Sequence, residues 1–127
     1  ARSLIFRDGA LKYASQSGAP LEPPIREDEW IAEAAMWTPW VYRGRCSAIQ
    51  PSEVLTFNVA LMVELVSAHP QPWNYAQQYA RGFVSYMNSL DMWCWSDLLR
   101  DPLLQSYIDE TCSIASKSTL VGEPMGI

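Results

Sequence analysis

Residues 71–89 read QPWNYAQQYARGFVSYMNS and show the clearest helical pattern in the chain. Pro72 suits the first position of a helix, because the first N–H groups of a helix have no partners and proline has no N–H to lose. Aromatic side chains then recur three or four residues apart, which places them along one side of a helix; they are Tyr75, Tyr79, Phe83 and Tyr86. We therefore expect a helix over residues 72–89 with an aromatic face.

The same proline signal occurs twice more, at Gln50-Pro51 and at Asp101-Pro102. Acidic residues favour the positive end of a helix, and Asp is a common N-cap. Together these signals predict further helices over residues 27–38, 51–68, 92–100 and 102–116. Connections of two to four residues would fold neighbouring helices back on each other. The expected fold is therefore all-α, a compact bundle of four to five helices.

The expected helix over residues 51–68 is apolar nearly all round, with its polar side chains in one narrow arc. A helix of this kind normally has neighbours on most sides. We therefore expect it to lie at the centre of the bundle.

The ends of the chain differ from this middle part. Residues 15–24 are rich in Ser, Gly and Pro, so we expect residues 1–26 to form an extended, Pro-rich N-terminal arm. Asp8-Gly9 lies between two short apolar runs and suggests a short β-hairpin over residues 4–13. The expected organisation is an arm over 1–26, a helical domain over 27–116 and a tail over 117–127.

Composition excludes several classes of protein. The 127 residues are 49% apolar and 18% charged, too apolar for a disordered chain. The net charge of −5 argues against a protein held on nucleic acid mainly by neutralising phosphates. No run of 18 apolar residues occurs, so the sequence predicts no transmembrane segment.

The three cysteines, Cys46, Cys94 and Cys112, are odd in number and far apart. This favours reduced thiols over a disulfide framework. The expected location is an intracellular, reducing compartment, and the sequence leaves open whether it is the cytosol or an organelle.

Few residues offer catalytic chemistry. The one histidine, His69, precedes a proline at an expected helix end, where a surface or capping position is common. No phosphate loop, dinucleotide motif or GxSxG motif is present. Two carboxylate pairs, Glu29 with Glu33 and Asp97 with Asp101, have helical spacing but no histidine motif beside them. We expect a non-enzymatic protein with no catalytic residue, no metal site and no cofactor.

Six tryptophans in a low-charge domain suggest surface that meets other proteins. The polar face of the helix over 72–89 carries amides and hydroxyls and a single charge, which favours hydrogen bonds to another surface. Trp93 is expected on the outer side of its helix. The expected function is a non-catalytic helical subunit that docks into a larger protein assembly, homo- or hetero-oligomeric. The candidate partner-binding residues are Trp93, Trp40, Tyr42, Asn74, Gln77, Gln78, Arg81 and Asn88.

Two alternatives remain open. Arginines beside aromatic side chains can hold single-stranded nucleic acid, as in a coat protein; the residues for this reading are Arg43, Arg45, Arg81, Tyr75 and Tyr79. The second alternative is a helical module that binds a hydrophobic ligand or pigment between its aromatic helices.

Overall fold

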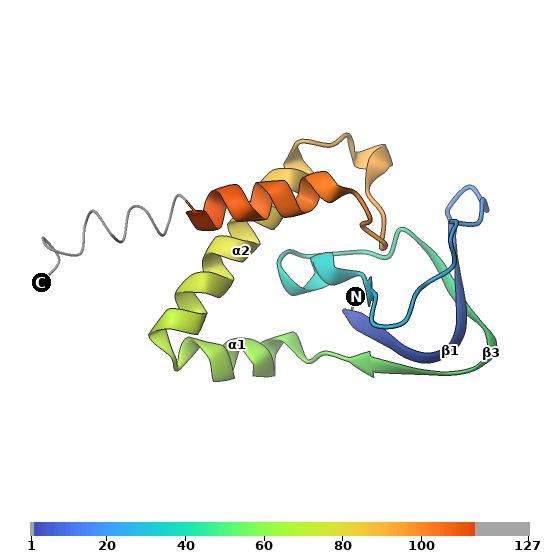
Figure 1. Ribbon diagram of the computed structural model, residues 1–127, viewed down its shortest axis with the longest axis horizontal. Coiled ribbons are helices and arrows are strands. Elements are labelled where there is room, and N and C mark those ends of the chain that lie inside the picture. Colours follow the sequence, from blue (N-terminus) through green and yellow to red (C-terminus); the bar gives the residue numbers. More distant parts are fainter. Residues whose placement is uncertain (1, 114–127) are drawn as a thin grey trace, which may run out of the picture. The chain divides into compact units, whose positions relative to one another are not determined.

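The computed structural model describes residues 2–113, which form a mixed α+β fold (Figure 1). Within this described range there are three helices and a three-stranded antiparallel sheet, with 42% of the described residues helical and 25% in strands. The all-α bundle expected from the sequence is therefore wrong. The elements are β1 (Leu4–Ser15), β2 (Trp30–Ile31), η1 (Glu33–Met36), β3 (Gly44–Thr56), α1 (Val59–Ser67), α2 (Pro70–Asn88), η2 (Met92–Cys94) and a last helix over residues 102–113.

Two compact units make up the described chain. The first, which we call the sheet unit, comprises residues 2–62 and 92–99. The second, the helix unit, comprises residues 63–91 and 100–113. The expected tail over 117–127 lies outside the described residues.

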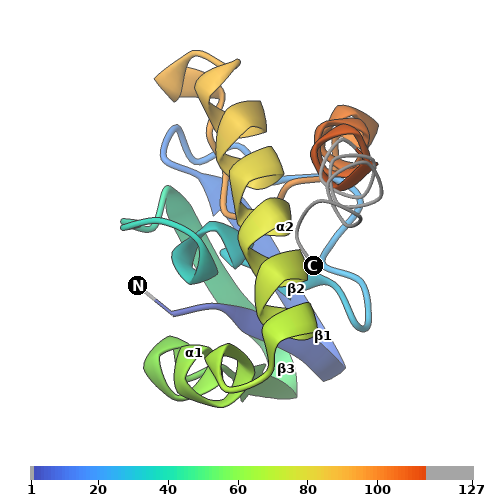
Figure 2. The ribbon, with the colours of Figure 1, turned by 90° about the vertical axis from the view of Figure 1, so that its left-hand side faces the viewer.

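Strand β1 is the central strand of the sheet, in the order β2-β1-β3 (Figure 2). It pairs with β3 from Leu4 opposite Thr56 to Ser15 opposite Gly44. The N-terminal arm expected from the sequence is thus a core strand. Its partner strand lies about 40 residues further along the chain, so a local sequence pattern could not predict the pairing. Asp8-Gly9 does not turn the chain into a hairpin. Gly9 has a φ of +108°, and the register of β1 against β3 shifts around it instead.

The core of the sheet unit lies on one face of β1. Alternate residues of a strand point to the same face, and Leu11 and Tyr13 are both buried. The buried residues that share this cluster are Phe6, Leu11, Tyr13, Ile25, Ile31, Ala32 and Leu98.

Two of the expected helices, over 27–38 and 92–100, are largely absent, and the helix expected over 51–68 is shortened to α1. Residues 27–38 form β2 and η1, and the left-handed backbone at Asp28 and Ala32 interrupts any longer helix. Residues 51–56 belong to β3, so Pro51 begins no helix. Residues 92–100 contain only the short turn η2.

Helix α2 confirms the prediction over 72–89 to within two residues, and it packs against the helix over 102–113. A Cβ on Gly82 would lie 2.8 Å from the Cα of Ile108, so glycine permits this close approach. Phe83 and Ile108 are fully buried there, and Tyr86 donates a hydrogen bond of 2.9 Å to Asp101. The last helix also agrees with its prediction up to residue 113.

Candidate protein-docking surface

Asp97 fixes the geometry of the sheet unit. Its side chain is buried, with 4% of its surface exposed, and its two carboxylate oxygens accept four hydrogen bonds. The donors are the Trp40 indole N–H (2.8 Å), the Tyr13 hydroxyl (3.0 Å), and the backbone N–H groups of Arg43 (2.8 Å) and Gly44 (3.0 Å). A buried carboxylate is costly unless it is hydrogen-bonded in this way. Asp97 thereby anchors the start of β3 to β1.

Gly44 has no side chain, and this allows its backbone N–H to approach the Asp97 carboxylate closely. A Cβ at this position would lie 2.5 Å from the Tyr13 hydroxyl oxygen and would also clash with the Ala14 carbonyl. Any larger residue would push the backbone away from the Asp97 carboxylate. The start of β3 is therefore set by side-chain contacts from distant parts of the chain.

A pocket of about 330 Å³ opens beside Asp97. Its wall includes Cys46, whose pKa is raised by partial desolvation of the thiol and by the negative charge of Asp97. Burial likewise raises the pKa of Tyr13. A raised pKa disfavours the reactive thiolate, and the Asp97 carboxylate is already occupied by four donors. The Tyr13 hydroxyl and the Asp97 carboxylate are joined by a hydrogen bond of 3.0 Å in this wall. The lining residues are Leu4, Tyr13, Ile31, Tyr42, Gly44, Arg45, Cys46 and Asp97.

Strand β3 is exposed along almost its whole length. None of its 13 residues is buried, and only Gly44 and Ser47 are half-buried. Its exposed apolar side chains include Ile49 (62% exposed), Val54 and Leu55. A long exposed strand at a sheet edge is a ready template for pairing with another chain.

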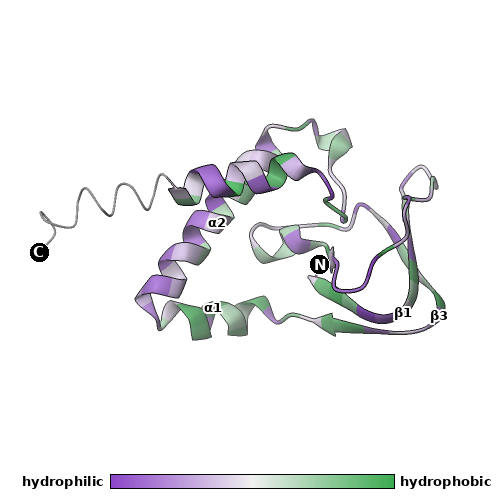
Figure 3. Cartoon of the chain, viewed as in Figure 1, coloured by the Kyte–Doolittle hydropathy of each residue, from purple (hydrophilic) through white to green (hydrophobic). Residues whose placement is uncertain are grey.

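Helix α1 is the second exposed apolar element. Seven of its nine residues are apolar, yet none is buried. Leu61 and Leu65 are 50% and 62% exposed, and green bands mark α1 in Figure 3. The expectation that this helix lies at the centre of a bundle is therefore wrong. Leu61 belongs to the sheet unit and Leu65 to the helix unit, and neither unit by itself buries an α1 side chain.

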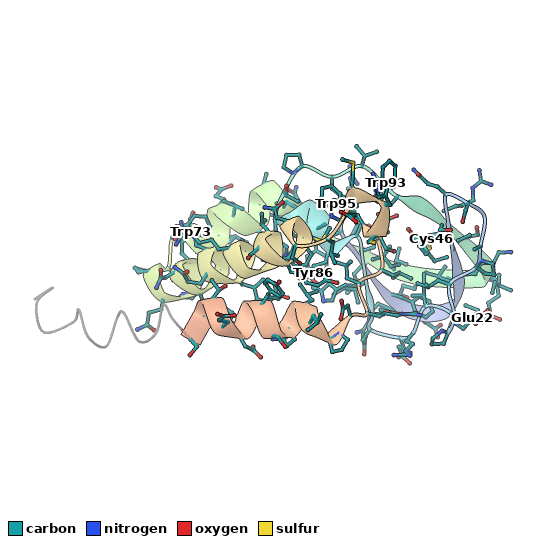
Figure 4. The ribbon with its side chains drawn as sticks, turned by 90° about the horizontal axis from the view of Figure 1, so that it is seen from above. Glu22, Cys46, Trp73, Tyr86, Trp93 and Trp95 are labelled. Atoms are coloured by element: carbon teal, nitrogen blue, oxygen red, sulfur yellow. The ribbon has the colours of Figure 1, made fainter. Side chains whose placement is uncertain are left out.

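Trp93 lies on the short turn η2 and is 89% exposed, which confirms that it points outward (Figure 4). Val41 and Met92 are also exposed. The Arg43 guanidinium ties these two segments together, because it donates to the Met92 carbonyl (2.9 Å) and lies over the Trp95 ring. The sheet unit thus exposes three large apolar side chains on these two segments: Val41, Met92 and Trp93.

Two other partner-binding candidates lie in the sheet unit and are engaged within it. Trp40 is half-buried and donates to Asp97, as described above. Tyr42 is 45% exposed, and its hydroxyl exchanges hydrogen bonds with the backbone of Arg2.

The remaining partner-binding candidates lie on α2, in the helix unit. Gln78 is half-buried. The other four are exposed: Asn74, Gln77, Arg81 and Asn88.

The residues of the nucleic-acid alternative fall in different units. Arg43 and Arg45 belong to the sheet unit, whereas Arg81, Tyr75 and Tyr79 belong to the helix unit. The Arg43 guanidinium is engaged with Met92 and Trp95, so Arg45 is the exposed arginine of the first pair. Tyr75 and Tyr79 lie with ring centroids 6.4 Å apart.

Sequence reasoning considered Asp97 only as half of a carboxylate pair with Asp101, and it missed the exposed side chains of β3. Asp97 stands between Ser96 and Leu98 with no motif around it. Its function as an anchor depends on partners from distant positions, which no local spacing reveals. The apolar run over 59–66 was recognised from the sequence. The same pattern, however, is compatible with a helix buried in its own fold and with an exposed helix that binds a partner.

In the described range 2–113, no helix is long and apolar enough to cross a membrane, and no three His, Cys, Asp or Glu side chains gather where they could hold a metal ion. The three cysteines are free. Comparisons of this chain with protein-family models, with curated proteins and with solved structures found no match.

Proposed function

We propose that this chain is a non-catalytic assembly subunit that docks onto another protein through helix α1. One observation carries the proposal: seven of the nine α1 residues are apolar and none is buried. Leu61 and Leu65 are one helical turn apart and so share a face. An apolar helix lying in a groove of a partner is a common mode of recognition between proteins.

The physical argument rests on the cost of exposed apolar surface. Fully burying a leucine side chain contributes about 1.5–3 kcal/mol, and α1 leaves roughly half of that gain unused at each of the two leucines, which are 50% and 62% exposed. Monomeric proteins rarely keep contiguous apolar patches of large area in water. A partner that covers α1 would recover this free energy.

The chemistry of α1 favours a protein over a lipid surface. The helix carries one charged residue, Glu64, and no Lys or Arg. Helices that lie on membranes are usually rich in Lys and Arg, which attract anionic lipids. At about 1.5 Å per residue, α1 is also roughly 14 Å long, about half the thickness of a bilayer core.

Trp93 supports the proposal as a second anchor. Tryptophan is enriched among the residues that dominate binding energy, and this side chain is almost fully exposed on a turn held by Arg43.

The test compares two double variants in the cells that make the protein. Leu61→Lys/Leu65→Lys places two charges on α1, and Gln71→Lys/Ser85→Lys places the same charges on exposed positions of α2 that are not partner-binding candidates. We expect the wild-type chain and the α2 variant to sediment in a complex larger than one chain. The α1 variant should sediment as the free chain, and its free energy of unfolding should change by less than about 0.5 kcal/mol.

Four results would overturn the proposal. The wild-type chain could sediment alone, or the α1 variant could stay in the complex. A loss of several kcal/mol in the α1 variant would show that α1 packs within its own fold. Pelleting of the wild-type chain with phosphatidylcholine–phosphatidylglycerol vesicles, lost in the α1 variant, would assign the helix to lipid instead.

A further inference from the structure

We infer that the outer edge of β3 pairs antiparallel with the β3 edge of a second copy of this chain, centred on Ile49. The inference goes beyond the proposed function, because it names a different surface and a specific partner. It stands on the free edge of β3, on the direction of its backbone groups and on the placement of its two charges.

Within the described residues, β3 has one neighbour in the sheet, β1. Backbone hydrogen bonds show which groups face outward. The Phe6 N–H and C=O bond to Glu29 and Asp28, away from β3, so Phe6 and Val54 form a non-hydrogen-bonded pair. In such a pair the backbone groups of Val54 point to the outer edge.

The same holds at the other end of β3. The Tyr13 carbonyl accepts from the Leu21 N–H, so Cys46, opposite Tyr13, also directs its backbone groups outward. Cys46 near the start of β3 and Val54 near its end therefore direct backbone groups to the outer edge, whereas the Gly44 N–H is already donated to Asp97.

Proline often protects a sheet edge because it lacks an N–H, but Pro51 does not protect this one. A Cβ on Gly9 of β1 would lie 2.6 Å from the Pro51 carbonyl oxygen, so that carbonyl faces β1. Backbone N–H and C=O of one strand residue point to the same side. The missing donor therefore lies on the inner side, where the Ser52 hydroxyl accepts from the Ala10 N–H (3.1 Å).

The charges of β3 select a second copy as the partner. Arg45 and Glu53 are its two charged residues, and each lies four positions from Ile49. Antiparallel self-pairing about Ile49 places each arginine opposite the glutamate of the other copy. It also places the exposed Ile49 side chains against each other. Parallel self-pairing would oppose like charges, which is unfavourable.

Sedimentation velocity over a range of concentrations tests this pairing with charge-reversal variants. Arg45→Glu and Glu53→Arg should each weaken dimerisation roughly tenfold or more, because each opposes like charges twice. The double variant R45E/E53R should restore it. An equimolar mixture of the two single variants should also restore it, because their strands are complementary. Arg26→Glu and Glu27→Arg change exposed side chains outside β3 and α1; they are the matched controls and should leave the dimer unchanged.

A cross-link provides a second test that needs no charge change. In a chain with all three native cysteines changed to Ser, Ile49→Cys should form an intermolecular disulfide on mild oxidation. Leu55→Cys should not, because the two copies of that position lie far apart in this register.

A monomer at all concentrations would overturn the inference, as would a dimer that ignores both charge reversals or fails to return in the mixture. These outcomes are separable from failure of the proposed function. A dimer lost in Leu61→Lys/Leu65→Lys but kept in Arg45→Glu would run through α1 and refute only the β3 pairing.

Discussion

The Tyr13 hydroxyl donates a hydrogen bond of 3.0 Å to the Asp97 carboxylate across 84 residues of chain. The same hydroxyl lies 3.3 Å from the Asp97 N–H, whose proton it accepts. Together with the Ala32 N–H, which donates to the Asp97 carbonyl (2.7 Å), these bonds lock residues 92–99 onto the sheet. The sheet unit is therefore closed by a segment that comes after α2 in the chain.

Removing the carboxylate should be the most damaging polar change in the sheet unit. Asp97→Ala leaves four donors without their acceptor, and each unsatisfied buried group costs about 1–3 kcal/mol. We expect the free energy of unfolding to fall by about 4 kcal/mol in urea denaturation. Tyr13→Phe should cost about 1–2 kcal/mol, since three donors remain. Asp8→Ala, an exposed carboxylate on β1, is the control; an equal loss there would refute the anchor.

Stability at high pH should depend on Tyr13. Burial raises the pKa of this hydroxyl above its ordinary value of about 10. The folded state therefore keeps the proton while the unfolded state loses it, so this contribution is full below about pH 10 and is lost as the pH rises further. We expect the free energy of unfolding of wild type to fall more steeply above pH 10 than that of Tyr13→Phe. Parallel curves for the two proteins would contradict this.

Local patterns found the helices of the helix unit and failed in the sheet unit. The aromatic spacing of Tyr79, Phe83 and Tyr86 is a property of one helix, so it could be found without knowing the neighbours. By contrast, β1 and β3 stabilise each other over a long separation. Pro51 therefore suggested the start of a helix, whereas residues 51–56 belong to the bulged strand β3.

The candidate site was foreseen only in part. The exposure of Trp93 was predicted from its place on the outer side of a helix over 92–100. The side chain is exposed, although that helix is absent. The prediction that α1 is buried was wrong. An apolar pattern indicates that a helix has neighbours, but it does not show whether they belong to the same chain or to another molecule. Asp97 was considered as half of a carboxylate pair with Asp101, whereas its partners are Tyr13, Trp40 and two backbone N–H groups.

The Cys46 thiol should be less reactive than its exposure suggests. Desolvation and the charge of Asp97 both raise its pKa, and the thiolate is the nucleophile. In a Cys94→Ser/Cys112→Ser chain, the rate of alkylation by iodoacetamide should reach half its maximum above the ordinary cysteine value of about pH 8.5. A short cysteine peptide under the same conditions is the reference. A midpoint at or below that of the peptide would show that the Asp97 charge does not reach the thiol.

Gly82→Ala separates helix propensity from packing in the helix unit. Alanine is about 1 kcal/mol better than glycine inside a helix, so propensity alone predicts a more stable protein. The new methyl group would instead lie 2.8 Å from the Ile108 Cα and 3.0 Å from the Tyr107 carbonyl oxygen, and both are backbone atoms that cannot rotate away. Overpacking of this kind costs about 1–3 kcal/mol, so the free energy of unfolding should fall. Ser85→Ala, on the exposed side of the same helix, should change it by less than about 0.5 kcal/mol. A Gly82→Ala protein more stable than wild type would show that the two helices do not approach this closely in solution.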